Sequence, residues 1–272
     1  MTDSLKFIEP FPEKPCSYWP GQDVPMQLYA LTGMVPLSPG DAVAGLNVHA
    51  LRRPVRMEGV KKGFLSMSYG SVAPLCPTCR ACVPLRVNIE KFSLSASQEK
   101  MMQQERYTYH FVDDLDKKEM YRLFSQYTKR RHGEKESSMH TWPREQFDEW
   151  LNFMPIVLTM FNKDTGRMAG FAGLEADAES AILEYIVFDP VYADDSIGKR
   201  LWLATMLLAR DAELPHVYVG AWAKSNPKLD YKKNHSGLET YNGTEWIDFD
   251  PKIHVLGPDY RAMIDREKLT LR

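Results

Sequence analysis

The chain has 272 residues, a net charge of −2, 44% hydrophobic residues and 26% charged residues. This balance is typical of a globular protein with an ample core, and the length suffices for one large or two modest domains. The near-neutral charge excludes bulk electrostatic attraction to nucleic acids, and the absence of a long apolar run excludes a membrane-spanning helix.

The N-terminus carries no secretion signal. Residues 1–10 contain acidic side chains and no continuous apolar run, unlike a signal peptide. We therefore expect a cytoplasmic protein without membrane attachment, in a compartment where disulfides are rare.

Residues 1 to about 92 are rich in proline and glycine and have only short apolar runs. Alternating apolar and polar residues predict short strands over residues 46–51, 63–69 and 83–89. The stretch over residues 63–70 leads into a cysteine-rich run and is interpreted as one arm of a hairpin. This part of the chain is otherwise expected to be irregular.

Three of the four cysteines lie within seven residues. Cys76, Cys79 and Cys82 have C-x2-C-x2-C spacing, and Cys16 lies in a second proline-rich segment. Four thiolates suit tetrahedral zinc or an iron–sulfur cluster, once folding brings the two segments together. The alternatives are cysteines that pack as small hydrophobic side chains, or a disulfide. We predict that the four thiols form one site.

Two helices are predicted from their start signals. Ser95 is followed three residues later by a glutamine, a capping-box pattern that predicts a helix over residues 95–106. A second helix is predicted over residues 143–153, with Thr141 as its N-cap and Pro143 in its first turn.

The region between these helices predicts one strand and one amphipathic helix. Residues 107–112 alternate as a strand does. From residue 116 to about residue 131, apolar side chains recur at helical spacing, with Met120, Leu123 and Phe124 on one face. We expect this face to contact the core.

The rest of the chain is rich in predicted strands, and one turn and two helices interrupt them. Strands are predicted over residues 156–161, 167–174, 181–188, 216–222 and 246–249, a hairpin turn over 162–166, and helices over 196–211 and 227–234.

This order of elements resembles the acetyltransferase-like GNAT fold. We predict an α+β protein with a small cysteine-containing N-terminal domain over residues 1–105 and a GNAT-like domain with a mixed central sheet over residues 106–272. In that fold, a loop and a helix N-terminus receive a phosphate-bearing group after the central strand. Only Gly198 is left of the glycine pattern that grips coenzyme A, and Asp194 and Asp195 would repel pyrophosphate.

Short motifs occur in a fixed order along most of the chain. They are Pro15-Cys16-Ser17-Tyr18-x-Pro20, Gly63-Phe64, the cysteine run to Arg86, Ser95-x-Ser97-Gln98, Tyr127-x-x-x-Arg131-His132, Tyr185-x-x-Phe188-Asp189-Pro190, Ser196-Ile197-Gly198, Val217-Tyr218-Val219-Gly220-x-Trp222, Lys228-x-x-Tyr231-Lys232 and Leu238-Glu239. Together they resemble the bacterial aminoacyl-tRNA–protein transferases, the leucyl-transferring relatives of arginyl-tRNA–protein transferase. Leu65 and Ser66 stand where that family has two arginines, which predicts a divergent member.

The resemblance implies a function and its partners. Leucine or arginine would pass from an aminoacyl-tRNA to the N-terminal α-amine of proteins that begin with Asp or Glu, and this would mark them for degradation. The ester is already activated, so transfer needs positioning, proton removal and an oxyanion binder, and no cofactor. The alternatives are an acyl-CoA-dependent N-acetyltransferase, or an inactive metal- or redox-responsive binding module on this scaffold.

The resemblance also places the chemistry on the C-terminal motif. Tyr231 and Lys232 would be catalytic, holding the terminal adenosine phosphate or polarising the ester carbonyl, and Lys228 would contact phosphate from the same helix face. The alternative for Lys232 is a solvated helix face. Ser196 and Gly198 would bind substrate at the loop before the helix over residues 196–211.

A second group of candidates would recognise the acceptor. His132 would be the general base, or a helix cap that interacts with the dipole. Arg131 would pair with the acceptor carboxylate, and Arg86 would do so too unless it is a surface arginine. Tyr18 would form an aromatic wall, or would simply pack.

Overall fold

The computed structural model describes residues 5–16, 23–31, 56–67, 70–111, 116–136, 141–152 and 154–270. The chain forms two compact units, one made of Met1–Arg86 with Gly220–Arg272 and the other of Val87–Val219. The crossings between them fall inside strands β5 (Val83–Asn88) and β10 (His216–Trp222). This division differs from the predicted boundary after residue 105, because the C-terminal residues pack with the N-terminal part.

The second unit contains a mixed sheet. Its strands lie in the order β10-β9-β8-β7-β6; the pairs β6–β7, β7–β8 and β8–β9 are antiparallel, and β10 is parallel to β9. The strands are β6 (Tyr107–Phe111), β7 (Ile156–Asn162), β8 (Met168–Ala176) and β9 (Ser180–Phe188). The unit has the strand order of the GNAT fold, and helix α5 (Ile197–Asp211) connects the parallel strands β9 and β10. The predicted α+β class with a mixed sheet is therefore confirmed.

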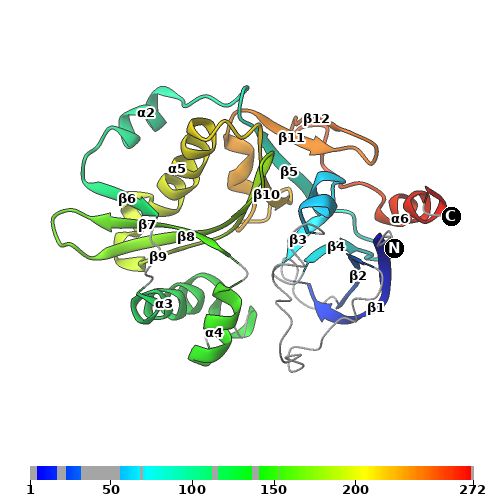
Figure 1. Ribbon diagram of the computed structural model, residues 1–272, viewed down its shortest axis with the longest axis horizontal. Helices are drawn as coiled ribbons and strands as arrows, with labels where there is room; N and C mark the ends of the chain where they lie inside the picture. The colour runs from blue at the N-terminus through cyan, green and yellow to red at the C-terminus, as the bar shows by residue number, and fades with distance from the viewer. Residues whose placement is uncertain are drawn as a thin grey trace. The chain divides into compact units, whose positions relative to one another are not determined.

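Helices cover both faces of this sheet (Figure 1). Helices α3 (Lys117–Glu136) and α4 (Arg144–Leu151) lie on one face, and α5 (Ile197–Asp211) lies on the other. The contact with α5 is close, since a Cβ atom on Gly170 would lie 3.1 Å from side-chain atoms of Ile197 and Leu201.

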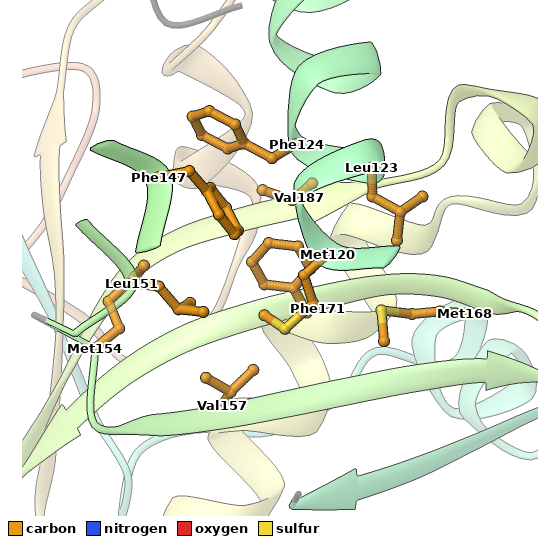
Figure 2. Packing of buried hydrophobic residues seen from close by; sticks show 10 residues of the cluster. All are labelled: Met120, Leu123, Phe124, Phe147, Leu151, Met154, Val157, Met168, Phe171 and Val187. Carbon is orange, nitrogen blue, oxygen red and sulfur yellow. The ribbon is translucent and has the colours of Figure 1, made fainter. Parts of the chain in front are cut away.

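The core between the sheet and helices α3 and α4 is aromatic and methionine-rich (Figure 2). Met120, Leu123 and Phe124 of α3 are fully buried there, as their spacing predicts, and they pack with Phe147 of α4 and Phe171 of β8. Full burial of such side chains stabilises the fold by roughly 1.5–3 kcal/mol each. This packing fixes α3 on the sheet.

Of the two predicted helix N-caps, Ser95 is correct and Thr141 is not. Helix α2 (Ala96–Met102) begins at Ser95 with both hydrogen bonds of a capping box, although it ends before residue 106. Helix α4 begins after Pro143, which is itself the N-cap and gives no side-chain hydrogen bond. The predicted N-cap at Thr141 was wrong, because the fixed φ of proline lets the helix start immediately after it.

The first unit contains a four-stranded antiparallel sheet in the order β1-β2-β4-β3. The hairpin of β3 (Leu65–Met67) and β4 (Gly70–Pro74) confirms the predicted arm. Strands β1 (Leu5–Pro15) and β2 (Asp23–Leu31) replace the irregular structure that we expected, and the strand predicted over residues 46–51 lies outside the described residues.

The C-terminal residues complete the first unit. They form the 3-10 helix η3 (Asp230–Asn234), strands β11 (Leu238–Tyr241) and β12 (Trp246–Asp248) and helix α6 (Tyr260–Thr270). Gly63 shows how closely these segments pack, because it has a φ of +83° and a Cβ atom there would lie 2.3 Å from the Tyr241 ring. Tyr260 also stacks on Phe64, with ring centroids 6.1 Å apart. No helix in the described part of the chain is long and apolar enough to cross a bilayer.

Candidate active site

The candidate residues fall in both units. Arg86, Lys228, Tyr231, Lys232 and the four cysteines belong to the first unit, and Arg131, Ser196 and Gly198 belong to the second. His132 lies within helix α3, although its side chain is outside the described atoms. Tyr18 lies outside the described residues.

Lys232 is a buried lysine. It lies in η3, is 8% exposed, and its Nζ donates a hydrogen bond to the carbonyl oxygen of Ala221 in β10 at 2.7 Å. Desolvation by burial lowers the pKa of Lys232 to about 7 from the usual 10.5. The solvated-face alternative therefore does not describe Lys232, and the ammonium coexists with a neutral amine near physiological pH.

The backbone around Lys232 accommodates this side chain. Gly220 has a φ of +72° within β10, and a Cβ atom there would lie 3.7 Å from Lys232 Nζ. Trp222 Nε1 donates to Asp230 Oδ1 at 3.2 Å, and Lys233 pairs with Asp230 Oδ2 at 2.7 Å. These contacts hold η3 against the end of β10.

Tyr231 and Lys228 do not lie on one helix face with Lys232, contrary to the prediction from the sequence. Tyr231 is 44% exposed and is among the large exposed side chains of the described residues. Lys228 lies in the turn before η3, where its N–H donates to Asn226 Oδ1 at 2.9 Å. The predicted helix over residues 227–234 is thus shorter, and Lys228 does not share a helix face with Tyr231 and Lys232.

Arg86 is engaged within the first unit. Its Nε and Nη2 atoms lie 2.8 and 2.7 Å from Glu239 Oε2, and its guanidinium lies 4.7 Å from the centroid of the Trp246 ring. Glu239 is buried, so Arg86 neutralises a carboxylate that would otherwise be costly to bury. An acceptor carboxylate would compete with Glu239 for this guanidinium.

The four cysteines belong to the first unit, and none forms a disulfide. Burial, followed by the charges of Cys16, Cys76 and Cys79, raises the pKa of Cys82 to about 12. Burial and the neighbouring thiols Cys79 and Cys16 likewise raise the pKa of Cys76. Within the described ranges, no set of three cysteine, histidine or acidic side chains already has the arrangement that holds a metal ion.

The cysteine run is braced by the loop before α6. Arg80 donates from Nε and Nη2 to the carbonyl oxygen of Gly257 at 3.0 and 2.7 Å, and Gly257 N–H donates to Arg80 O at 2.6 Å. A Cβ atom on Gly257 would lie 2.0 Å from the carbonyl oxygen of Cys82. Only glycine fits this approach, so Gly257 is required for the contact of this loop with the cysteine run.

In the second unit, β9 pairs with β10 over a shorter stretch than with β8. It pairs with β10 through Ser180–Ile182 alone, whereas its pairing with β8 continues to Phe188. The register shifts between Gly173 and Leu174, which makes Glu184 the extra residue of a β-bulge. Residues 184–186 are consequently half-buried in a strand whose first four residues are buried.

The loop between β9 and α5 ends in a fixed carboxylate. Tyr107 donates from its hydroxyl to Asp195 Oδ2 at 2.5 Å, and Arg106 Nη1 lies 3.0 Å from Asp195 Oδ1. Burial, followed by the hydrogen bond to Asp195, raises the pKa of Tyr107 to about 12. The buried Arg200 donates to Asp195 O at 3.0 Å, which ties the loop to α5.

Ser196 and Gly198 lie at the start of α5. Ser196 is the N-cap in the left-handed region, with a φ of 57° and no side-chain capping hydrogen bond. A Cβ atom on Gly198 would lie 3.2 Å from the Phe188 ring, so the glycine allows α5 to approach β9. The negative charge of Asp195 beside this helix start is unfavourable for a pyrophosphate.

Arg131 lies toward the C-terminal end of α3. Its guanidinium hydrogen-bonds to the hydroxyl of Tyr127, one turn earlier, and Arg131 itself is exposed. The Tyr127 ring contacts Phe188 and Tyr185 of β9 edge-to-face, with centroids 4.9 and 6.3 Å apart. The aromatic contacts therefore hold the Tyr127 ring against this strand.

The chain is similar to known protein families. Residues 119–242 match the family model "Arginine-tRNA-protein transferase, C terminus". An aspartate/glutamate leucyltransferase of Ruegeria pomeroyi is 30% identical over 71% of this chain and 72% of its own length. A protein of the same name from Aeromonas hydrophila is 31% identical over 70% of this chain and 79% of its own.

The chain belongs to the aspartate/glutamate leucyltransferase family. This is a family of aminoacyltransferases, so the chain is an enzyme of that class. Among solved structures, a GCN5-related N-acetyltransferase from Sphaerobacter thermophilus has a TM-score of 0.35 and 15% identity, and covers 62% of this chain and 53% of its own. The predicted family is thus confirmed.

Several residues of the site were not found from the sequence. Glu239, the partner of Arg86, lies 153 positions away in the chain, and no local pattern predicts the pair. The bulge at Glu184 is also invisible in the sequence, because the apolar run from residue 181 to 188 continues through it. A glycine inside the predicted strand over 216–222 was the available signal for a backbone irregularity at Gly220.

Proposed function

We propose that the chain transfers an amino acid, leucine or arginine, from an aminoacyl-tRNA to the N-terminal α-amine of proteins that begin with Asp or Glu, and so marks these proteins for degradation. The observation that carries the proposal is the match to leucyltransferases over about 70% of the chain.

The proposed reaction needs no covalent enzyme intermediate. The neutral α-amine attacks the ester carbonyl, an amide bond forms, the ester C–O bond breaks, and the 3′ hydroxyl of the tRNA leaves with a proton. We propose that Lys232 accepts a proton from the α-ammonium, since burial keeps part of this lysine neutral near pH 7. We assign to Tyr231 the binding of substrate beside Lys232, because it is exposed.

The transfer is tested with purified protein, a panel of charged tRNAs, and peptides that begin with Asp, Glu, Ala or Lys. The expected product is an Asp- or Glu-starting peptide that is longer by one residue, and its mass identifies the donated amino acid. The absence of product with every charged tRNA would favour a binding module on this scaffold.

We also propose that the four cysteines bind zinc or an iron–sulfur cluster. The support is that Cys16, Cys76 and Cys79 each raise the pKa of Cys82. The hydrogen bond from Arg80 to Gly257 O also holds the loop of the cysteine run. The thiols would have to move closer together to coordinate a metal ion. We assign the metal site no step in the transfer.

Metal analysis of the purified protein tests this site. We expect about one zinc ion, or one cluster with its visible absorption band, per chain, and a loss of this content in Cys79→Ser. Ser97→Ala, a change of one small polar side chain outside the cysteine run, serves as the control. Equal metal content in Cys79→Ser and in the unchanged protein would contradict the proposal.

A further inference from the structure

Two consecutive residues of strand β10 hold the short helix η3. Ala221 contributes the carbonyl oxygen that accepts a hydrogen bond from Lys232 Nζ at 2.7 Å. The next residue, Trp222, donates from Nε1 to Asp230 Oδ1 at 3.2 Å. One bond holds the lysine side chain, and the other holds the first residue of the 3-10 helix that carries this lysine.

The Trp222 indole is itself held by aromatic neighbours. Its side chain is 1% exposed, and its ring meets Phe249 edge-to-face with the centroids 5.1 Å apart. Phe249 stacks on His254 at 6.1 Å, and the Asp250 N–H donates to His254 Nδ1 at 2.8 Å. Contacts of this kind restrict the orientation of the ring, so the indole N–H is aimed at η3 by the packing around it.

The acceptor of this hydrogen bond is a charged carboxylate. Lys233 Nζ lies 2.7 Å from Asp230 Oδ2, while Trp222 donates to Oδ1. The hydrogen bond from Lys233 lowers the pKa of Asp230, which keeps the carboxyl group ionised near neutral pH. A hydrogen bond to an ionised acceptor is stronger than one between neutral groups, which makes the pair of Trp222 and Asp230 suited to hold η3 in place.

The position of η3 determines how far water reaches Lys232. The residue is 8% exposed, and burial is the cause of its lowered pKa. If η3 moved away from β10, water would solvate the ammonium and the pKa of Lys232 would rise toward the usual 10.5. A smaller share of this lysine would then be neutral at pH 7 and able to accept a proton.

We propose that Trp222 is a positioning residue for the transfer, because its hydrogen bond to Asp230 keeps η3 closed on β10 and the Lys232 amine buried. The inference rests on the proposed function, in which Lys232 accepts a proton from the α-ammonium of the acceptor. In this role Trp222 acts through η3 and touches no reacting atom. The alternative is an indole that fills the core and has no effect on the protonation of Lys232.

The pKa of Lys232 tests the inference without any substrate. An NMR titration of the lysine side chains measures it, and Lys232→Met assigns the resonance. Trp222→Phe keeps an aromatic ring and loses the N–H, so we expect the pKa of Lys232 to rise by about one unit, the equivalent of one lost hydrogen bond. An unchanged pKa of Lys232 in Trp222→Phe would overturn the inference.

Asp230→Ala removes the same hydrogen bond from the half-buried side of η3 and leaves the aromatic core intact. The loss of a negative charge would by itself lower the pKa of Lys232, whereas the opening of η3 would raise it. We expect a rise in Asp230→Ala and a smaller rise in Asp230→Asn, whose amide oxygen can still accept from Trp222. The double variant with Trp222→Phe should exceed neither single variant, since both remove one bond. A lowered pKa in Asp230→Ala would contradict the inference.

The pH dependence of kcat for transfer is the second readout. The acidic limb of the profile should move to higher pH in Trp222→Phe by as much as the pKa of Lys232 rises. Transfer at pH 7 should then fall roughly fivefold and recover near pH 9 in initial rates with freshly charged tRNA. The acceptor α-ammonium titrates alike with every variant, so the difference between the profiles belongs to the protein.

Trp202→Phe is the matched control for the loss of an indole. Trp202 of α5 is also 1% exposed, and its ring also meets a phenylalanine ring edge-on, that of Phe92 at 6.1 Å. We expect Trp202→Phe to lower the free energy of unfolding without moving the acidic limb. The same shift of this limb in both tryptophan variants would show that Trp222 acts through general stability and would overturn the inference.

The two readouts separate the inference from the function on which it rests. A raised pKa of Lys232 with an unmoved acidic limb would overturn the positioning role, because the protonation of Lys232 would then not limit transfer. The absence of transfer by the unchanged protein would refute the proposed function instead. In that case the NMR titration would still decide whether Trp222 keeps the Lys232 amine buried.

Discussion

At the scale of single residues, Lys232 shows how burial changes chemistry. The Lys232 side chain is buried, and its amine donates a hydrogen bond to the Ala221 carbonyl oxygen. Desolvation by this burial lowers the pKa of Lys232 to about 7. The neighbouring Lys233 is exposed and paired with Asp230. Two consecutive lysines with identical chemistry therefore have different environments.

This pKa makes a prediction about stability. Between about pH 7 and 10.5 the unfolded chain carries the proton that folded Lys232 has lost, so the free energy of unfolding should rise with pH. One group contributes up to about 1.4 kcal/mol per pH unit in this window, and the contribution is lost as the pH falls toward 7. Denaturant unfolding at pH 7.5 and 9 should therefore show a smaller slope in Lys232→Met.

Lys233→Met is the matched control, and its slope should equal that of the unchanged protein. An unaltered pH slope in Lys232→Met would mean that the lysine is charged in the folded state. The sequence suggested a solvated face for this pair as one alternative, since a local pattern of two lysines contains no information on what covers them.

At the scale of elements, Arg200 connects three segments of the second unit. This buried arginine of α5 donates to Met101 O at 2.6 Å, to the Gln104 side chain and to Asp195 O, and lies 5.2 Å from the Tyr107 ring centroid. The end of α2, the start of β6 and the start of α5 are joined by this one side chain.

Replacement of Arg200 should be costly. Arg200→Met would leave two backbone carbonyl groups without these bonds, and we expect the free energy of unfolding to fall by about 2–4 kcal/mol. Arg210→Met, on the exposed end of the same helix, should change it by less than about 1 kcal/mol. A similar fall in the free energy of unfolding for the two variants, measured by denaturant unfolding, would show that Arg200 does not stabilise the fold through these contacts.

The elements differ in how far the sequence predicts them. The capping box at Ser95 and the apolar face of α3 are local patterns, and both are present in the structure. Strand β11 and helix α6 were missed, because they are short or polar segments that become ordered by contacts with Gly63 and Phe64. The predicted helix over residues 227–234 was too long, because a turn at Lys228 replaces its first part.

At the scale of the whole molecule, the chain order hides the division into units. Residues 220–272 pack with the N-terminal part, as the contacts of Arg80 with Gly257 illustrate. The motifs that resemble the transferase family were nonetheless readable, since they are runs of a few residues. The candidate residues could therefore be named from the sequence, while partners such as Glu239 and the bulge at Glu184 depend on long-range pairing.

The central claim is that this chain uses an aminoacyl ester as donor and an acidic N-terminus as acceptor. The most direct measurement is the mass of an Asp-starting peptide after incubation with the protein, total charged tRNA and acetyl-CoA together. We predict a gain of one leucyl or arginyl residue, which ribonuclease treatment of the tRNA abolishes. A gain of one acetyl group, unaffected by ribonuclease, would contradict the account.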